Sequence, residues 1–493
     1  MTASAFLWAL LLAPLAGGLA CLACRSARAV LRATVLGVLA AALAAGICIW
    51  MTRASGSIAA ARGWLYLDAL SAIHLLVMMT VFTTSSLYMH GYFQPEILDG
   101  SLSLKVARRF SALWFGALAA MTLVLLSNNI GIMWAGLEAT TLVTAFLICI
   151  HRSSESVEAM WKYLIICSVG VAFAFMGTLL AAAAANGLHL PASEALLWTR
   201  LREHAGEFDP VLMKAAFVFL LVGYGTKAGL APMHSWLPDA HSQAPAPVSA
   251  IFSGFMLNAA LYCVMRYVPL VEEASGQAGW SLRLLLLFGL VSMVTAAAFI
   301  VFQHDLKRLL AYSSVEHLGI IAVGLGLGGA GTFAALLHAL NHALCKPLSF
   351  FAAGRLGQMY GTHDVRTMAG ALRAAPVWGK ALFGGLLVLI GAAPFAVFLS
   401  EFLIVRAAAS SGSYWTMGLF LAAAGIVFVG VLQRAITIAW GDPVMQPHAE
   451  QAGAVDKALV LVSLGVLLVL GLWIPGPLWH MLDDAARIVR GAP

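Results

Sequence analysis

The stretch "GYGTKAGLAPMHSWLPDAHSQAPAPVS", residues 223–249, places one lysine, two histidines and four prolines between two strongly apolar segments. Pro232 has no N–H to continue an α-helix, and its ring pushes against the preceding turn, so the helix breaks just past Lys227. A backbone break at membrane depth is tolerated only where protein buries it or water reaches it. The stretch therefore predicts a broken membrane helix that carries a buried lysine.

The composition of the whole chain supports a membrane location. The chain has 493 residues, of which 61% are hydrophobic and 10% are charged, whereas soluble domains carry about 25% charged residues. Apolar runs of membrane-spanning length, about 17–25 residues, recur from end to end. We predict an all-α integral membrane protein with fourteen transmembrane helices, at residues 4–23, 29–51, 64–89, 109–127, 129–150, 160–185, 211–230, 247–268, 282–302, 308–328, 331–354, 378–405, 414–440 and 456–475.

The distribution of Lys and Arg predicts the orientation. These residues gather in the loops that follow odd-numbered helices, and basic loops stay on the cytoplasmic side. Both termini are therefore expected on the non-cytoplasmic side of the cell inner membrane. The first apolar run lacks a basic segment before it, so it is predicted to span the membrane rather than to be a removed signal peptide. The net charge of +6 needs no nucleic-acid partner, since the bilayer accounts for the basic loops.

No cofactor or metal site is predicted. The seven cysteines are scattered, and the CxxC pair Cys21 and Cys24 has no second pair or nearby histidine to complete a metal site. Gly-rich phosphate loops, dinucleotide fingerprints and nucleophile elbows are not found.

Several ionisable residues are predicted at membrane depth, where each costs about 2.5–3.5 kcal/mol on insertion scales. They are Glu138, Lys227, Glu316, His317 and Glu401, together with His338, His342 and Lys346. The last three follow an i, i+4, i+8 spacing, which places them on one helix face. Because histidine exchanges protons near neutral pH, this face is suited to proton transfer. An alternative reading, a haem or quinone site at His338 and His342, conflicts with the need for axial ligands on opposite sides of a haem.

The motifs "GTKAGLAPMHSWLPDAHSQAPAPVSA", "WAGLEATTL", "HDLKRLLAYSSVEHLGI", "LLHALNHALCKPLSFFAAG" and "SEFLIV" resemble the antiporter-like, proton-conducting membrane subunits. These subunits occur in respiratory complex I, in Mrp cation/proton antiporters and in membrane-bound group 4 hydrogenases. The similarity covers roughly residues 105–410. Asn258, where M-type subunits of complex I carry a lysine, and "SSVEHLG" are most similar to the component F branch of hydrogenase-4 and formate hydrogenlyase complexes.

The resemblance implies two inverted five-helix repeats with broken seventh and twelfth helices. The implied organisation is 1–108 for helices 1–3, 109–268 for the first repeat, 269–440 for the second repeat and 441–493 for helix 14. It also implies other membrane subunits as partners, together with a peripheral module containing nickel–iron hydrogenase-like and iron–sulfur subunits. The chain itself would then be a non-catalytic proton-pumping subunit.

The resemblance also assigns roles to residues. It implies an ion pair between Glu138 and Lys227, a relay through His338, His342 and Lys346, and Glu401 as the terminal group. At 4 Å and an effective dielectric of 20, an ion pair is coupled by about 4 kcal/mol, so moving Glu138 away would favour proton release by Lys227.

Further residues are expected along the same path. His234 and His241 are expected near the cytoplasmic uptake side, on a non-helical crossing held by prolines, and Asn258 is expected to hold water at the centre. The open alternatives are an M-type subunit of an NADH–quinone oxidoreductase, a subunit of a Mrp-type or bicarbonate-uptake complex, and a quinone- or haem-binding redox enzyme.

Overall fold

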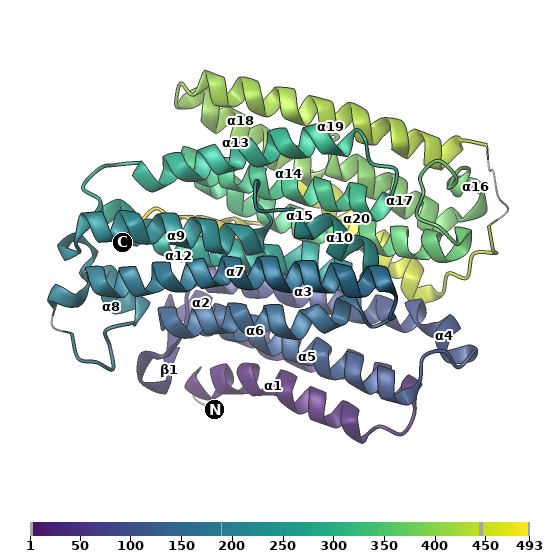
Figure 1. Ribbon diagram of the computed structural model, residues 1–493, viewed down its shortest axis with the longest axis horizontal. Helices are drawn as coiled ribbons and strands as arrows, with labels where there is room; N and C mark the ends of the chain where they lie inside the picture. Colours follow the sequence, from purple (N-terminus) through teal and green to yellow (C-terminus); the bar gives the residue numbers. More distant parts are fainter. Residues whose placement is uncertain (1–2, 189, 443–446, 492–493) are drawn as a thin grey trace.

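The computed structural model describes residues 3–188, 190–442 and 447–491, and nearly all of them are helical (Figure 1). The long helices run along the long axis of the molecule, side by side. The elements up to residue 274 are α1 (Ala3–Ala23), α2 (Ala27–Ser55), β1 (Ile58–Ala60), β2 (Leu65–Leu67), α3 (Ala69–Tyr92), α4 (Gln94–Leu98), α5 (Leu104–Leu126), α6 (Ile130–Ile148), α7 (Ser154–Ala184), α8 (Trp198–Glu203), α9 (Pro210–Ala228), α10 (Trp236–Gln243), α11 (Ala246–Ile251), a π-helical turn (Phe252–Met256) and α12 (Leu257–Ala274).

The rest of the chain continues the same pattern. Its helices are α13 (Trp280–Ile300), α14 (Leu306–Leu327), α15 (Gly329–Tyr360), α16 (Ala371–Ala374), α17 (Pro376–Leu389), α18 (Ala396–Ser410), α19 (Tyr414–Trp440), α20 (Ala454–Leu472) and α21 (Gly476–Val489). Three short 3-10 turns, at Ala61–Gly63, Asn186–Leu188 and Ala205–Glu207, complete the described elements.

The predicted spans coincide with these helices. Within the described residues, twelve helices are long and apolar enough to cross a membrane. The two remaining predicted spans correspond to α15, whose apolar character is lowered by its histidines and lysine, and to α17 and α18, which are two halves of a broken helix. The prediction of an all-α, multi-pass membrane protein is confirmed.

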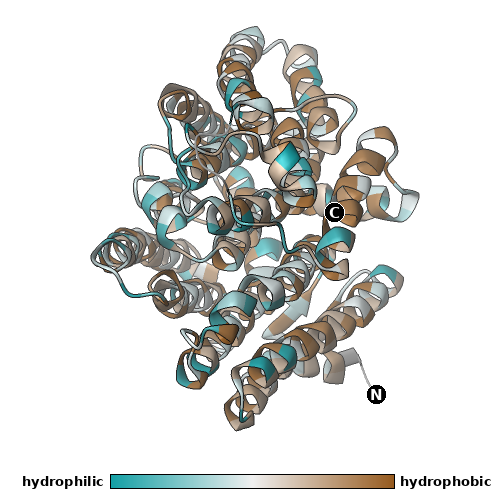
Figure 2. Cartoon of the chain, turned by 90° about the vertical axis from the view of Figure 1, so that its right-hand side faces the viewer, coloured by the Kyte–Doolittle hydropathy of each residue, from teal (hydrophilic) through white to brown (hydrophobic). Residues whose placement is uncertain are grey.

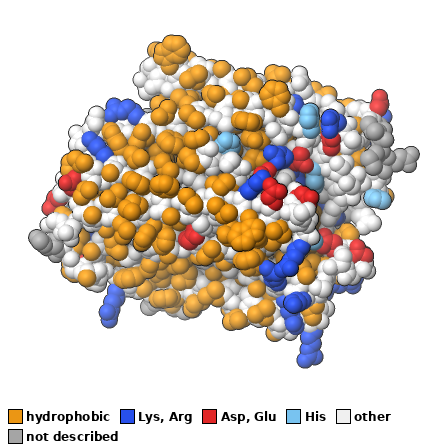
Figure 3. All heavy atoms as spheres, viewed as in Figure 1, with side chains coloured by type: hydrophobic (Ala, Val, Ile, Leu, Met, Phe, Trp, Pro, Cys, Tyr) orange, Lys and Arg blue, Asp and Glu red, His pale blue; other side chains and the backbone are white. Residues whose placement is uncertain are grey.

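The outer surface of the bundle is apolar. Viewed along the helices, hydrophobic residues dominate the perimeter (Figure 2). On the face that shows α7, hydrophobic side chains cover the middle and charged ones lie mainly toward the ends (Figure 3). Exposed Leu43, Phe173 and Leu461 illustrate this surface, which would be costly in water and is matched to lipid tails.

Both ends of the chain lie at the same end of the bundle. The markers for both termini and the β1–β2 hairpin lie toward one end, while α4 and α16 lie at the other (Figure 1). Near the C-terminus, Arg202, which belongs to α8, donates to the Gly491 carbonyl at 2.5 Å. This arrangement fits an even number of membrane crossings. Which end faces the cytoplasm stays a prediction from the basic loops.

Two elements were not predicted. The antiparallel hairpin β1–β2 pairs Ile58 with Leu67 inside what was expected to be a loop and the start of helix 3. The region 441–493 was expected to hold one helix, but it also holds α21, which buries Met481, Leu482 and Ala485 against α3 and α12. Its apolar face is too short to span a membrane, so a search for long apolar runs passes over it.

The two helix breaks share a sequence and a conformation. "GLAP" (229–232) follows α9, and "GAAP" (391–394) follows α17. Gly229 has φ 77° and Gly391 has φ 68°, values that favour glycine, and both following Ala–Pro bonds are cis. The prediction of broken helices near Pro232 and Pro394 is confirmed. These breaks interrupt the seventh and twelfth membrane segments near the buried ionisable residues.

One detail of the first break was predicted wrongly. The crossing that follows Pro232 was expected to be non-helical, but residues 236–243 form α10. Pro238 is compatible with this helix because it lies in the first turn, where backbone N–H groups have no partner within the helix. The Trp236 indole donates to the Thr226 carbonyl at 2.9 Å, which ties α10 back to the end of α9.

Candidate functional site

Lys227 lies in the last turn of α9 and is fully buried. Its ammonium group donates to the Thr141 hydroxyl at 2.9 Å and to the Tyr163 hydroxyl at 2.5 Å. The Tyr163 ring also lies 4.7 Å from the ammonium nitrogen, a cation–π distance. Three helices, α6, α7 and α9, therefore hold one lysine away from lipid.

Glu138 lies half-buried on α6 and accepts a hydrogen bond from Ser168 at 2.9 Å. Among the described residues it forms no ion pair with Lys227, so the direct pair implied by the resemblance is not present in this structure. Glu138 and Thr141 are three residues apart on α6, a spacing that puts both on one helix face. The second Glu138 carboxylate oxygen has no hydrogen-bond partner in the described chain. The two charges therefore lie on the same side of α6, with Thr141 as the direct contact of the lysine.

The histidines of α15 meet a histidine of α14. His338 Nε2 lies 2.9 Å from His317 Nδ1, and His338 Nδ1 lies 2.9 Å from the Ser400 hydroxyl. The rings of His317 and His342 have centroids 5.0 Å apart. All three histidines are fully buried. The predicted one-sided stripe on α15 thus faces α14, and His317 bridges two of its members.

Lys346 continues the stripe by one turn. Its ammonium group donates to the Leu310 carbonyl at 2.8 Å and also to the Ser313 hydroxyl. Glu316, which lies one turn further along α14, is 4% exposed, and one of its carboxylate oxygens has no partner in the described chain. The α14–α15 interface therefore contains two ionisable groups and three histidines at the centre of the bundle.

Glu401 lies one residue after Ser400 on α18, past the second helix break. Its carboxylate packs directly against Gly391, where a Cβ atom would come within 2.2 Å of Oε2. The Asn341 amide donates to the Ala396 carbonyl at 2.7 Å and to Ser400 at 3.2 Å, which fixes the start of α18. Ser400 thus links Glu401's helix to His338.

The two histidines near the first break occupy different environments. His241 is fully buried on α10 and stacks on Phe350 at 4.9 Å and 15°. Phe350 is one turn beyond Lys346 on α15, so His241 lies at the end of the α15 stripe. His234 is half-buried with its ring 6.1 Å from that of Tyr312. His241 therefore lies deep in the bundle, whereas His234 lies closer to the protein surface; their place on an uptake path stays a prediction.

α10 is held in place by charges at its C-terminal end. The buried Lys307 ammonium donates to the Ser242 carbonyl at 3.0 Å and to the Ala244 carbonyl at 2.5 Å. Cations are favourable at the C-terminus of a helix because its last carbonyls lack partners. At the surface of the same helix, Asp239 pairs with Arg308 at 2.5 Å and with Lys162 at 3.1 Å.

Asn258 is buried at the start of α12, and its amide donates to the Gly254 carbonyl at 3.1 Å. Gly254 belongs to the π-helical turn, a feature that recurs at functional sites. The Ser253 and Ser314 hydroxyls lie 2.8 Å apart and connect this turn to α14. On the other side, the Tyr163 hydroxyl donates to the Met256 sulfur of the turn at 3.6 Å, so Asn258 follows a turn that contacts both the Lys227 half and the α14–α15 half of the molecule.

Several residues of the site were missed by the sequence reasoning. They are the hydroxyl groups of Thr141, Tyr163, Ser168, Ser313 and Ser400. Thr141 and Ser400 stand inside the quoted motifs "WAGLEATTL" and "SEFLIV", beside the glutamates. A rule that looks for hydroxyls near buried charges would have found these two, but Tyr163 on α7 needs the packing of three helices.

Three ligand atoms could hold a metal ion. They belong to His317, His338 and Glu401 and lie within 4.8 Å of one another. Two of these groups already share a hydrogen bond, between His317 and His338. The absence of a metal site, expected from the sequence, is therefore not established by the geometry, and two histidines and one carboxylate would fit a divalent transition metal.

Comparison with known proteins shows which family the chain belongs to. A sequence profile described as "NADH:quinone oxidoreductase/Mrp antiporter, TM" matches residues 127–427. A hydrogenase-4 component F homolog from Methylacidiphilum infernorum is 39% identical over 378 residues, 76% of this chain and 79% of that protein. Hydrogenase-4 component B from Escherichia coli is 27% identical over 444 residues, 85% of this chain and 64% of that protein.

Solved structures agree. A chain of the archaeal membrane-bound sulfane sulfur reductase has a TM-score of 0.87 at 26% identity, covering 99% of this chain and 97% of that one. A chain of the Mrp complex from Dietzia has the same fold, with a TM-score of 0.87 at 19% identity, covering 99% and 98%. Since the profile spans more than half of the sequence and the first relative is well above 30% identical, the chain belongs to the family of NADH:quinone oxidoreductase and Mrp antiporter transmembrane subunits.

Proposed function

We propose that this chain is the proton-translocating membrane subunit of a multisubunit, redox-driven complex of the group 4 hydrogenase type, in the cell inner membrane with both termini on the non-cytoplasmic side. The observation that carries the proposal is the buried row of ionisable groups between the two helix breaks. Burying one charge at membrane depth is costly, and such residues mark ion pathways. Here at least five such groups lie in one connected region.

The first half of the row stores a proton. Lys227 keeps its ammonium group in a dry site by donating to two hydroxyl groups. Glu138, on the same face of α6 as Thr141, supplies the charge that stabilises the ammonium form. A conformational change that moves this carboxylate away raises the cost of the ammonium form and favours proton release toward the centre of the bundle.

The second half of the row passes the proton on. Lys346, His342, His317 and His338 follow one another along the α14–α15 interface, and Ser400 connects the last histidine to the helix of Glu401. Both ring nitrogens of His342 and one of His317 have no partner in the described chain. Buried polar atoms of this kind are satisfied by ordered water. Water molecules there would complete the steps that the direct contacts leave open.

The finer assignment rests on the relatives. The 39% identity to a hydrogenase-4 component F homolog favours a complex whose peripheral module contains nickel–iron hydrogenase-like and iron–sulfur subunits. Similarity to chains of a sulfane sulfur reductase and of complex I keeps a different redox module as the alternative. A haem-binding role is disfavoured, because His338 uses both ring nitrogens in hydrogen bonds to His317 and Ser400.

The deciding experiment is proton pumping by the whole purified complex in liposomes, with a pH-sensitive dye outside and the electron donor of the complex added. We expect uptake or release of protons that an uncoupler abolishes and that persists without Na⁺. Redox turnover with no proton movement, or movement that requires Na⁺, would contradict the proposal. Co-purification of a tagged chain, followed by nickel analysis of the assembled complex, tests the hydrogenase-type partner separately.

A further inference from the structure

A second polar stripe runs along α12. Asn258, Tyr262 and Arg266 are spaced i, i+4, i+8, and all three are buried, with exposures of 2%, 0% and 4%. At 1.5 Å per residue this stripe is about 12 Å long, and it leads from the centre of the candidate site toward the end of the bundle that carries the β1–β2 hairpin. Arg266 lies inside this helix.

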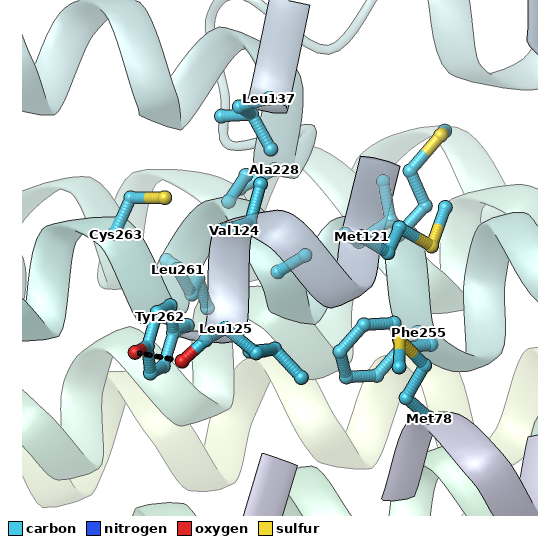
Figure 4. Packing of buried hydrophobic residues seen from close by; sticks show 14 of the residues in the cluster. Met78, Met121, Val124, Leu125, Leu137, Ala228, Phe255, Leu261, Tyr262 and Cys263 are labelled. Atoms are coloured by element: carbon cyan, nitrogen blue, oxygen red, sulfur yellow. Dashed lines mark hydrogen bonds between the residues drawn. The ribbon is translucent and has the colours of Figure 1, made fainter. Parts of the chain in front are cut away.

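Polar groups of α3 and α5 line the stripe. The Tyr262 hydroxyl lies 3.0 Å from the Ser71 hydroxyl and donates to the Leu125 carbonyl at 3.1 Å (Figure 4). The His74 ring centroid lies 5.1 Å from that of Tyr262. Its Nδ1 contacts the Leu70 carbonyl, but its Nε2 has no partner in the described chain, so His74 still has one free ring nitrogen beside Tyr262.

Apolar side chains bound the stripe on its other sides. Met78, Leu261 and Phe255 pack around this part of α12 (Figure 4). The polar groups thus form a single file through a dry core. Tyr163, which accepts from Lys227, donates to the Met256 sulfur at 3.6 Å. Met256 belongs to the π-helical turn just before Asn258, so hydroxyl and imidazole groups that lead on from this turn offer protons a way out of the first half of the molecule.

The outer end of the file is closed by an ion pair. Arg266 donates to both carboxylate oxygens of Asp68, at 2.6 Å and 2.7 Å, and to Ser71 at 2.6 Å. The guanidinium carbon lies 4.6 Å from the Trp198 ring. Asp68 is the N-cap of α3 and is 3% exposed. Burial alone would raise the pKa of Asp68, but Arg266 and Ser71 outweigh burial and hold that pKa below its usual value, so the carboxylate is ionised.

The chemistry of this end stops a proton rather than passing it on. A guanidinium does not release its proton in a protein, so Arg266 cannot act as a relay. Its Nε donates to the Tyr262 hydroxyl at 3.0 Å, so a proton that approaches along the file meets the guanidinium before the Asp68 carboxylate and is repelled by the nearer positive charge, as in pores whose arginines exclude cations. Asp68 cannot accept the proton easily either, because Arg266 occupies both of its oxygens.

We propose that Arg266, held in place by Asp68, is an electrostatic barrier that keeps protons from leaking outward along the α12 file. The inference rests on the proposed proton transport, since a barrier matters only where protons are stored. It separates storage at Lys227 from release, which then occurs through the second half of the molecule. Arg266 is thus a residue that determines the direction of transport.

The test measures passive proton leak, with no electron donor, in liposomes that contain the whole complex and carry a potassium diffusion potential. The double variant Asp68→Asn/Arg266→Gln replaces the ion pair by two neutral side chains that still hydrogen-bond. We expect its leak per intact complex to rise, but by less than the roughly hundredfold that removing one unpaired charge at about 6 Å and an effective dielectric of 20 would give, because the lost carboxylate had offset part of the field of the guanidinium. The single variant Asp68→Asn retains the Arg266 cation, so its proton leak should stay at the wild-type rate.

A third variant shows whether the leak uses the file. Adding Asn258→Leu to the double variant dries the inner end and should return the leak to the wild-type rate. Three results would each contradict the barrier. They are a leak from Asp68→Asn alone that equals that of the double variant, a leak that persists after Asn258→Leu is added, and a double variant that leaks no faster than the wild type. Arg266→Gln, measured in the same way, is the second variant if the double variant assembles poorly.

The leak assay and the pumping assay test the two proposals separately. If the wild-type complex turns over without moving protons, the proposed function is wrong, whatever the leak shows. If the wild type pumps and the neutral variants stay tight, only the barrier is wrong.

Discussion

The two broken helices carry the same Gly-x-Ala-Pro sequence but place their ionisable groups differently. At the first break, Lys227 precedes Gly229 by two residues and is fully enclosed by α6 and α7. At the second break, Glu401 follows Gly391 by ten residues and is half-buried. Both prolines, Pro232 and Pro394, are exposed, but the alanine before the second one, Ala393, is exposed whereas the matching Ala231 of the first break is buried.

The two breaks differ in which residues satisfy the polar groups of the irregular backbone. The first break is finished within the chain, because the Ala231 amide donates to the Ser292 hydroxyl at 2.9 Å and the lysine has two hydroxyl partners. The second leaves irregular backbone at the surface of a membrane protein, where lipid cannot satisfy its polar groups. We therefore expect a neighbouring membrane subunit of the complex to cover the second break and to lie beside Glu401.

The largest effect is expected at the enclosed break. Lys227→Ala removes the proton-storing group and should abolish proton pumping by the liposome-reconstituted complex while redox subunits remain bound. Lys227→Arg should also fail largely, because a guanidinium keeps its proton. Lys214→Ala, on the same helix near its other end, is the matched control and should pump normally. Full pumping by Lys227→Ala at normal complex abundance would remove Lys227 from the pathway.

At the open break, Glu401→Gln should reduce pumping strongly, since a neutral amide cannot take a proton from His338 through Ser400. Glu401→Asp retains the carboxylate one methylene further back and should retain part of the rate. The comparison between the breaks predicts that removing the neighbouring subunit changes the pumping rates of the Glu401 variants but not those of the Lys227 variants. Initial pumping rates per complex, with and without that subunit, are the measurement. Identical responses of the Lys227 and Glu401 variants would show that the two breaks are not differently completed.

The sequence predicted the parts of this comparison that depend on chain-local chemistry. Pro232 and Pro394 forced the breaks, and the spacing of His338, His342 and Lys346 put them on one face. It could not predict which group each lysine touches. Tyr163 lies 64 residues before Lys227, and His317 meets His338 only because α14 packs on α15. The implied contact of Glu138 with Lys227 is absent from the described structure, in which two of the three ammonium N–H groups donate to hydroxyl groups instead.

The second break should also be sensitive to the helix that supports it. Gly471 of α20 packs so closely that a Cβ atom would come within 2.0 Å of the Pro394 carbonyl. Gly471→Ala should therefore displace the break at a cost of about 1–3 kcal/mol, typical of overpacking, and lower the thermal stability of the complex and its pumping rate together. Gly465→Ala is the control, because no atom of the described residues lies within 4 Å of its Cβ position. Equal behaviour of the two variants would mean that α20 does not position the break.

The smallest effect is expected from the hydroxyl groups that enclose Lys227. Tyr163→Phe removes one acceptor from the ammonium group and leaves Thr141 as the other. A hydrogen bond to a charged group contributes about 1.5–3 kcal/mol, so losing one should shift the proton affinity of Lys227 by about tenfold or more. Pumping should then fall most at high pH, where the weakened lysine holds its proton least, and recover as the pH is lowered.

Tyr224→Phe on α9 is the matched control, because the Tyr224 hydroxyl is buried without a partner in the described chain, and its removal should leave the pH profile unchanged. The profile of pumping rate against pH decides the matter, since a purely structural defect would lower the rate at every pH by the same factor.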